Sequence, residues 1–166
     1  MTHKNLLLIM LLTIKKALSS LLLLFALSTS AEINNVSIVI HGGAGWFEGM
    51  AQDDIDGIKK ALEESANKGY EIMLKSGTSI DAVEEAIVIL EDNPLFNAGK
   101  GAVYTSEFKQ ELDASIMNGS DLNAGAAASV TNVKNPIRLA RHIMENTKHV
   151  MFSSKGAERV AKEAGL

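Results

Sequence analysis

One connection, LEDNPLFNAGKGAVY from Leu90 to Tyr104, constrains the fold of this chain more than any other stretch. It follows an amphipathic helical pattern and leads directly into an apolar run. Joining a helix to a strand takes only about 2–6 residues, yet here Leu95 and Phe96 place large apolar side chains inside the connection. Gly99 and Gly101 permit close backbone approach or positive φ. We therefore predict that this connection packs against the rest of the fold.

A second glycine cluster, HGGAG at residues 41–45, follows the short β-branched run Val36–Ile40. That run is apolar on both faces and is typical of a buried central strand. The cluster fits three uses: a dinucleotide loop, an oxyanion loop of the esterase type, or a backbone-dense turn beside another site. The first needs a further glycine where Glu48 stands, and the second needs a GxSxG motif that the sequence lacks. Gly99-Lys100-Gly101 does not fit the phosphate-binding GxxxxGK[ST] frame either.

The first 31 residues have the order of a secretory signal peptide. They contain three lysines and no acid, then an apolar run from Ala17 to Leu27, then a small polar segment ending at Ala31. We expect residues 1–31 to be this leader and residues 32–166 to be an exported domain, periplasmic or secreted. The run is shorter than the roughly 18–20 residues that span a bilayer, so no membrane segment is expected after leader removal. Met1 and Met10 are both candidate starts, and Met10 gives the more regular leader.

Charge and cysteine content exclude several classes of protein. The chain carries 16 basic and 20 acidic residues, and three of the basic but none of the acidic ones lie in the leader. The remaining 13 basic and 20 acidic residues give a net charge of −7. An acidic domain without a basic run has little affinity for a phosphate backbone, so no nucleic-acid partner is expected. The absence of cysteine excludes disulfides, a thiolate nucleophile and a cysteine-based zinc site.

Periodicity over the rest of the chain predicts a layered α+β fold. Helices are expected over residues 53–76, 78–93, 137–145 and 155–162, and strands over 36–40, 102–105, 111–117, 124–130 and 150–152. Thr78 and Asp81 have the spacing of a capping box, while Asp53 is a candidate N-cap and Gly77 a candidate C′ residue. Asn118-Gly119 predicts a hairpin, and the small residues of its second strand suit a closely packed further layer.

Residue spacing alone yields no complete catalytic set. The histidines are His3, His41, His142 and His149. None has a partner at helix-ligand spacing, and a lone histidine is more often structural than a ligand. Four carboxylates are candidates for acid–base chemistry, although surface or capping roles are the more frequent use of such residues. They are Glu91, Asp92, Glu111 and Asp113.

Four segments together resemble one family. They are IVIHGGAG (38–45), DAVEEAIVILEDNPLFNAGKGAVY (81–104), ELDASIMNG (111–119) and NPIRLARHIMENTKHVM (135–151). The family is the plant-type asparaginases and isoaspartyl peptidases, which are N-terminal-nucleophile hydrolases. Related glycosylasparaginases keep a similar DA-x-MDG hairpin but lack the HGGAG and LFNAGKGA motifs, which favours the asparaginase and isoaspartyl peptidase branch. One departure is Asn118, where the family usually has aspartate before the glycine.

The resemblance implies an αββα four-layer sandwich, made from a precursor that cuts itself into two subunits. The new N-terminal threonine of the second subunit is then the nucleophile, with its own amine as base. On this reading the chain is most of the first subunit, incomplete without the C-terminal β subunit. It holds no catalytic residue, because the nucleophilic threonine is expected beyond Leu166, and it is inactive alone. The implied substrates are isoaspartyl (β-aspartyl) peptides, L-asparagine or both, and the implied assembly is (αβ)₂.

Few site residues carry over from the family. Gly42 and Gly43 match the loop packed beside the nucleophile, and Asn97 matches an asparagine whose side chain approaches it. No cofactor is implied for catalysis, but a structural sodium ion is, held by main-chain carbonyl oxygens, which suit hard cations. These carbonyls belong to Leu90, Glu91, Asn93, Phe96, Ala98 and Lys100.

Two other interpretations remain open from the sequence. One is an exported, non-catalytic relic, whose exposed sheet edges favour aggregation. The other is a stand-alone binding domain with the same fold signature. Soluble, monomeric expression of residues 32–166 with a cooperative melt would favour the binding domain, whereas insolubility cured by a second subunit would favour the enzyme.

Overall fold

A computed structural model describes residues 35–45 and 47–166. The chain divides into two units, Met1–Asn35 and Val36–Leu166. The first unit lies almost wholly outside the described residues, and so do the predicted signal peptide and both candidate start residues. No helix within the described residues is long and apolar enough to cross a membrane.

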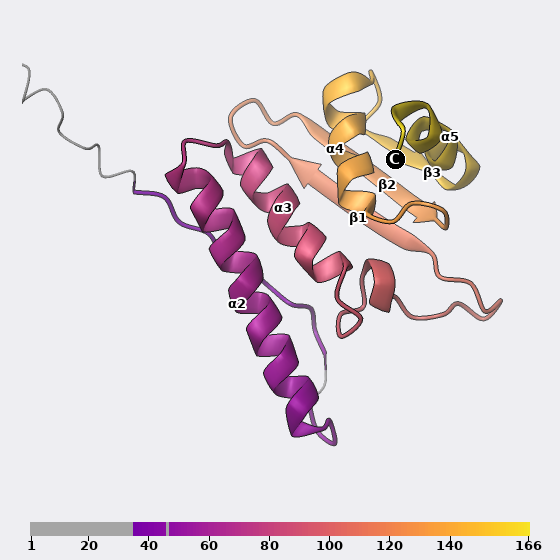
Figure 1. Cartoon of the computed structure of the whole chain (residues 1–166). Coiled ribbons are helices and arrows are strands. Elements are labelled where there is room, and N and C mark those ends of the chain that lie inside the picture. The colour runs from indigo at the N-terminus through magenta and orange to yellow at the C-terminus, as the bar shows by residue number, and fades with distance from the viewer. Residues whose placement is uncertain (1–34, 46) are drawn as a thin grey trace, which may run out of the picture. The chain divides into compact units, whose positions relative to one another are not determined.

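The second unit has the α+β composition that the sequence predicts (Figure 1). Most of its predicted helices and strands are present within one to three residues of their expected bounds. In chain order the elements are α2 (Gln52–Leu74), α3 (Ser79–Glu91), the 3₁₀ turn η1 (Gly99–Gly101), β1 (Leu112–Met117), β2 (Ala124–Val130), α4 (Pro136–Asn146), β3 (Met151–Ser153) and α5 (Ser154–Ala164).

The three strands form one sheet in the order β1-β2-β3. β1 and β2 are antiparallel, which confirms the predicted hairpin, and β2 and β3 are parallel, with α4 between them in the chain. The register of β1 and β2 slips between Leu112 and Ala114. At this bulge Ser129 has φ 52°, and its N–H donates a hydrogen bond of 2.7 Å to Asp113 Oδ1. The carboxylate thus replaces the missing ladder partner.

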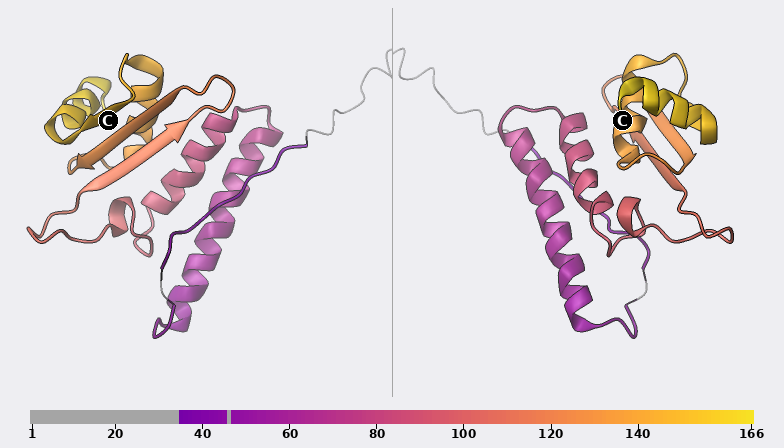
Figure 2. Two further views of the ribbon diagram at one scale, coloured as in Figure 1. Left: turned by 180° about the vertical axis from the view of Figure 1, so that it is seen from behind. Right: turned by 45° about the vertical axis from the view of Figure 1, so that its right-hand side comes forward.

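All the helices that contact the sheet lie on one of its faces. One core cluster joins Leu139 of α4 and Ala157 of α5 to Val130 of β2, and a second joins Ile80 of α3 to Ile116 of β1. The opposite face carries no described helix (Figure 2). On that face Met117 is 58% exposed and Met151 is 56% exposed. A sheet with only one covered face leaves apolar surface available for another layer.

Specific capping interactions define the end of α2 and the start of α3. Thr78 Oγ1 accepts a hydrogen bond from Asp81 N at 3.1 Å, and Asp81 Oδ2 accepts one from Thr78 N at 3.1 Å, which confirms the capping box. Gly77 was predicted to be the C′ residue of this helix, but Ser76 occupies that position in the left-handed conformation with φ 65°, so Gly77 is the C″ residue. The Gly77 N–H then donates to Ile72 O at 2.9 Å, completing a Schellman-type end.

The predicted N-cap at Asp53 is wrong. The structure places Ala51 at the N-cap of α2, with no side-chain cap, and Asp53 lies in the first turn. An acidic side chain in the first turn still complements the partial positive charge of the helix end. The N-cap therefore lies two residues before its predicted position, and Asp53 acts through its charge in the first turn rather than as a cap.

Two predicted strands are also wrong. Val36–Ile40 forms no strand with any partner among the described residues, and Val39 is 92% exposed rather than buried. In residues 102–105 only Tyr104 pairs, with Gln110, in a single antiparallel bridge. A strand is stabilised by hydrogen bonds to a neighbour, so an apolar β-branched run without that neighbour stays an unpaired segment.

Candidate functional site

The Leu90–Tyr104 connection is packed at Phe96, as predicted, whereas Leu95 is exposed. Phe96 is buried, and it forms a core cluster with Ile58 and Ala61 of α2 and Leu90 at the end of α3. Within the connection, Asn93 Oδ1 accepts a hydrogen bond of 2.9 Å from Leu95 N. The connection is therefore fixed both by burial of its aromatic side chain and by its own polar groups.

The two glycine-rich segments, distant in the sequence, meet at Phe96. A Cβ atom added to Gly42 would lie 3.2 Å from Phe96 Cε1 and 3.0 Å from Leu62 Cδ2. Gly43 follows with φ 101°, and its N–H donates to His41 Nδ1 at 3.2 Å. This geometry favours the third use of the HGGAG cluster, a backbone-dense turn beside another site.

Asn97 is held by a contact within the connection. Its side chain is exposed, and Oδ1 accepts a hydrogen bond of 3.0 Å from Val103 N. Gln110 Nε2 donates to the neighbouring Ala102 carbonyl. Because the Oδ1 atom of Asn97 is engaged, the amide NH₂ group is the part of this side chain left to meet a further group.

Main-chain carbonyl oxygens crowd around the glycines of the connection. Gly99 has φ 48°, and a Cβ there would collide with the Glu91 carbonyl; at Gly101 it would collide with those of Pro94 and Phe96. Of the six carbonyls expected to hold sodium, those of Leu90, Asn93 and Ala98 each accept one backbone N–H bond. A carbonyl oxygen has two lone pairs, so these bonds leave acceptor capacity.

The donor chemistry of this connection fits a hard cation. Across residues 35–45 and 47–166 no group of three or more His, Asp or Glu side chains could hold a metal ion. Any cation at the connection would therefore be bound by main-chain oxygens rather than by a side-chain cluster.

Glu91 has a structural role that the sequence does not reveal. Its buried carboxylate accepts hydrogen bonds from Ile137 N at 3.0 Å and from Asn135 Nδ2 at 3.1 Å, and so ties the end of α3 to the first turn of α4. Desolvation outweighs both hydrogen bonds and raises the pKa of Glu91 to about 7. The Asn135-Pro136 pair predicts a helix start, but only the structure shows that Asn135 makes no cap of its own and that Glu91 supplies one.

Glu91 is expected to make stability depend on pH. The carboxyl titrates near 4.5 when unfolded and near 7 when folded, so the folded state binds the extra proton between these values. The free energy of unfolding should therefore fall by about 2–3 kcal/mol as pH rises from about 5 to 8. Urea unfolding at several pH values in this range measures the change.

The matched variant for this experiment is Glu91→Gln. It retains an acceptor for the Ile137 N–H and is expected to flatten the pH profile. Asp81 and Asp92 have lowered pKa values, because they accept hydrogen bonds from Thr78 and Lys134 respectively, and they titrate below this window. A stability that rises from pH 5 to 8 in the unsubstituted chain would contradict the role assigned to Glu91.

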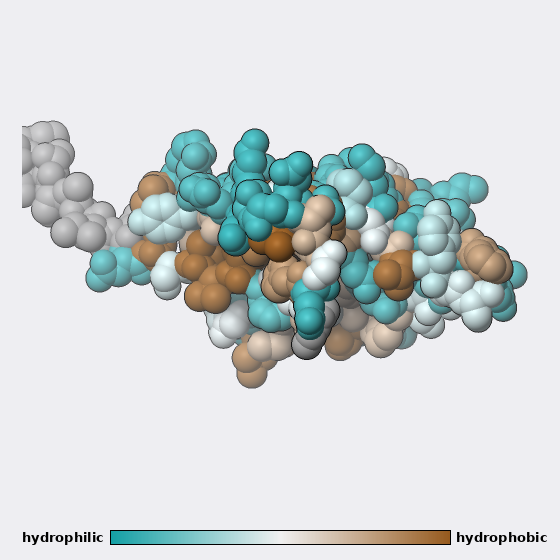
Figure 3. Space-filling view, turned by 90° about the horizontal axis from the view of Figure 1, so that it is seen from below, coloured by the Kyte–Doolittle hydropathy of each residue, from teal (hydrophilic) through white to brown (hydrophobic). Residues whose placement is uncertain are grey.

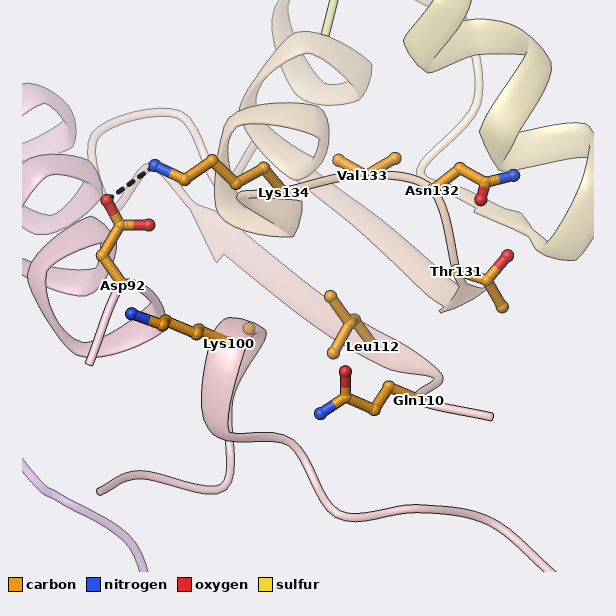
Figure 4. A pocket seen from close by; sticks show the side chains of 9 residues that line it. Asp92, Lys100, Gln110, Leu112, Thr131, Asn132, Val133 and Lys134 are labelled. Atoms are coloured by element: carbon orange, nitrogen blue, oxygen red, sulfur yellow. Dashed lines mark hydrogen bonds and ion pairs between the residues drawn. The ribbon is translucent and has the colours of Figure 1, made fainter. Parts of the chain in front are cut away.

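A pocket of about 550 Å³ lies beside the connection (Figure 4). Among the residues that line it, Lys134 Nζ donates to Asp92 Oδ2 at 2.8 Å, and Lys100 lies on the other side of the same carboxylate. None of Gly42, Gly43 and Asn97 lines it. The lining residues are Asp92, Gly99, Lys100, Gln110, Leu112, Thr131, Asn132, Val133 and Lys134.

The four candidate carboxylates do not converge into an acid–base site. Glu91, at the end of α3, directs its buried carboxylate to the start of α4, Asp92 pairs with Lys134, and Asp113 holds the bulge, while Glu111 is exposed. Capping and pairing roles therefore account for Glu91, Asp92 and Asp113. His142 and His149 lie near Asn146 and Phe152 respectively, in local contacts within the described chain.

An α+β domain with one bare sheet face and two glycine-rich segments in contact is consistent with part of an N-terminal-nucleophile hydrolase fold. The sequence model of a family described as "Asparaginase" matches residues 34–166. The chain belongs to this asparaginase family, which comprises N-terminal-nucleophile hydrolases acting on small substrates.

The relatives carry two kinds of name. "Plant-type L-asparaginase" of Pyrococcus furiosus is 47% identical over 131 residues, which are 79% of this chain and 42% of the relative. "Isoaspartyl peptidase/L-asparaginase" of Bos taurus is 41% identical over 132 residues, 80% of this chain and 42% of the relative. The Xenopus laevis protein of the same name is 40% identical over 130 residues, which are 78% of this chain and 41% of the relative. The chain thus spans about two fifths of the length of these relatives.

Proposed function

We propose that this chain is the N-terminal part of a self-processing hydrolase of isoaspartyl peptides and L-asparagine. The observation that carries the proposal is the 40–47% identity to relatives named for these two activities. The identity extends over about four fifths of this chain, including both glycine-rich segments that the fold brings together.

The partner in this proposal is a C-terminal β subunit that supplies the second sheet layer of an αββα sandwich, in an (αβ)₂ assembly. The bare face of the β1-β2-β3 sheet supports it. That face presents Ala124, Ala126 and Ala128 of β2, and small side chains permit close approach of a second sheet.

In the proposed reaction the β subunit brings the nucleophile, an N-terminal threonine. Its hydroxyl oxygen attacks the side-chain carbonyl carbon of the β-aspartyl group while its own amine accepts the hydroxyl proton. The C–N bond then breaks, the leaving amine (ammonia from L-asparagine) takes that proton, and water hydrolyses the resulting ester to release aspartate and restore the threonine. The residues of this chain would position the threonine. The Gly42-Gly43 turn would leave room beside the nucleophile, and the Asn97 NH₂ group would donate a hydrogen bond toward it. The 166 residues therefore supply supporting groups, and we expect them to be inactive on their own.

Sodium is the cation proposed for the carbonyl-lined connection, held by oxygens of Leu90, Glu91, Asn93, Phe96, Ala98 and Lys100. We expect about 100 mM sodium chloride to raise the melting temperature by about 2–5 °C relative to choline chloride at equal ionic strength, because the cation binds only the folded connection. Differential scanning calorimetry measures the shift. Equal melting temperatures in the two salts would argue against a sodium site.

Export is proposed for the leader, residues 1–31, with translation starting at Met10. Residues 10–31 fused to an export-dependent alkaline phosphatase should give periplasmic activity. A fusion that remains inactive inside the cell would count against this part of the proposal.

Self-processing is the part of the proposal most open to a direct experiment. The chain is joined in frame to the part of the Pyrococcus furiosus relative that follows the matched region, and the product is weighed by intact mass spectrometry. Two polypeptides, the second beginning with threonine, are the expected result, with the relative itself as positive control. A single uncut polypeptide that is folded by circular dichroism would contradict the proposal.

A further inference from the structure

Two large apolar residues are held in a backbone conformation that such residues rarely adopt. Five non-glycine residues in the described ranges have positive φ: Ser76, Phe108, Leu122, Ser129 and Ser154. Only Phe108 (φ 58°) and Leu122 (φ 61°) have large apolar side chains, and these are 86% and 71% exposed. Both the strain and the exposure are unfavourable for the chain by itself.

Phe108 lies in a hydrogen-bonded turn between Thr105 and Lys109. The Phe108 N–H donates to Thr105 O at 3.0 Å, and the Thr105 N–H donates to Lys109 O at 2.8 Å. Thr105 Oγ1 also accepts from Glu107 N at 3.2 Å, and Glu107 pairs with Lys109 at 2.9 Å. The side chain of Phe108 is thus presented by a fixed backbone.

Leu122 is presented in a similar way by the loop between β1 and β2. Its N–H donates to Asn118 O at 2.8 Å, and the Asn118 N–H donates to Asn123 O at 2.8 Å. Asn123 Nδ2 donates to Met144 O at 3.0 Å, which anchors the loop to α4. This loop is therefore fixed both internally and from the helix layer.

The two turns lie at opposite ends of strand β1 (Figure 1). Between them runs the bare face of the sheet, with Met117 at the end of β1 that is nearer to Leu122. Figure 3 views the molecule from below rather than onto this face, and there too apolar residues reach the surface among polar ones. Rigid, preorganised apolar side chains at both ends of a bare sheet are suited to contact whatever covers that sheet.

We propose that Phe108 and Leu122, at the two ends of β1, are paired anchors that bind the second sheet layer. This rests on the proposed function, because the occupant is the C-terminal part of the family protein. The length of the relatives supports that choice, since this chain covers only 42% of the Pyrococcus furiosus protein and more than half of that relative lies outside the match. Burial of the two side chains against that layer offsets the strain of their backbones.

Three glycine substitutions test the anchors. Phe108→Gly and Leu122→Gly remove an anchor together with its strain, whereas Ser76→Gly removes the same kind of strain in the connection after α2 and serves as matched control. Each should raise the melting temperature of the full chain alone by about 1–4 °C, because glycine adopts positive φ without penalty. For Phe108→Gly and Leu122→Gly we expect a more stable chain but a weaker complex, whereas for Ser76→Gly we expect only the more stable chain.

Association is measured with the full chain co-expressed with the C-terminal part of the Pyrococcus furiosus relative. The purified complex is diluted and its dissociation followed by mass photometry. Phe108→Gly and Leu122→Gly should each weaken the complex about fivefold or more, and Ser76→Gly should leave it unchanged. Unweakened complexes in both anchor variants would overturn the inference while leaving the proposed function standing.

Two further outcomes are informative. If the unsubstituted chain forms no complex although the relative's own N-terminal part does, the proposed function and the anchors fail together. If the full chain alone forms a dimer that both anchor variants weaken, the anchors serve a second copy of this chain, and the occupant named here is wrong.

Discussion

Gly125→Ala is expected to destabilise the chain by about 3–4 kcal/mol, a large part of the stability of a domain this size. Helix α4 crosses β2 directly over this glycine. An added Cβ would lie 2.5 Å from Met144 N and closer still to Ala140 O, and both atoms belong to the helix backbone. The helix would have to move off the sheet and out of contact with the core at Ile143 and Val130. Urea unfolding followed by far-UV circular dichroism measures the loss.

Gly119→Ala is the matched control for Gly125→Ala. Gly119 lies in the β1–β2 loop, where an added Cβ meets no atom within 4 Å and φ is not in the left-handed range. Its substitution should change the free energy of unfolding by less than about 0.5 kcal/mol. Equal effects at the two glycines would mean that α4 does not approach β2 as closely as described.

Arg141→Leu is expected to cost about 2–4 kcal/mol, the second largest effect. The Arg141 guanidinium contacts three carboxylates: Glu84 at 2.6 Å, Asp81 at 2.8 Å and Glu145 at 2.9 Å. The Glu84 side chain is only 9% exposed. Removing the cation leaves this buried carboxylate with Arg138 alone, at 3.6 Å, and an incompletely paired buried charge is strongly destabilising.

A double-mutant cycle separates the ion pair from the loss of packing. Arg141→Leu with Glu84→Leu should be more stable than the sum of the two single changes predicts, because neither charge is then left unpaired. Lys134→Ala provides the control, since it removes a short ion pair, 2.8 Å from Lys134 Nζ to Asp92 Oδ2, in which the lysine is largely exposed. That change should cost less than about 1 kcal/mol. A strictly additive cycle would contradict the importance assigned to the Arg141–Glu84 pair.

Local signals in the sequence predict most of the helices and the hairpin. The capping box at Thr78 and the proline at the first turn of α4 depend on residues close in the chain, and both predictions are confirmed. The run Val36–Ile40 was wrongly predicted to be a strand, because its pairing depends on a partner that local pattern does not specify. Ser76 took the left-handed position expected of Gly77, because the length of α2 is decided by packing as well as by glycine.

The candidate site was predictable in parts. The unusual apolar content of the Leu90–Tyr104 connection predicted its packing, and its glycines do permit close approach of carbonyl oxygens. The meeting of Gly42 with Phe96 and the role of the Glu91 side chain depend on tertiary contacts between residues more than 40 positions apart, which periodicity and spacing do not encode. Resemblance to a family supplied the expectations for Gly42, Gly43 and Asn97, and those residue roles remain predictions.

The most direct test of the central proposal is hydrolysis of an isoaspartyl dipeptide and of L-asparagine. The purified full chain is assayed alone and as the complex co-expressed with the C-terminal part of the Pyrococcus furiosus relative, by release of aspartate or ammonia. We predict no activity above background for the chain alone and hydrolysis by the complex that is lost when the N-terminal threonine of the partner is replaced by alanine. Hydrolysis by the 166-residue chain alone would contradict the account.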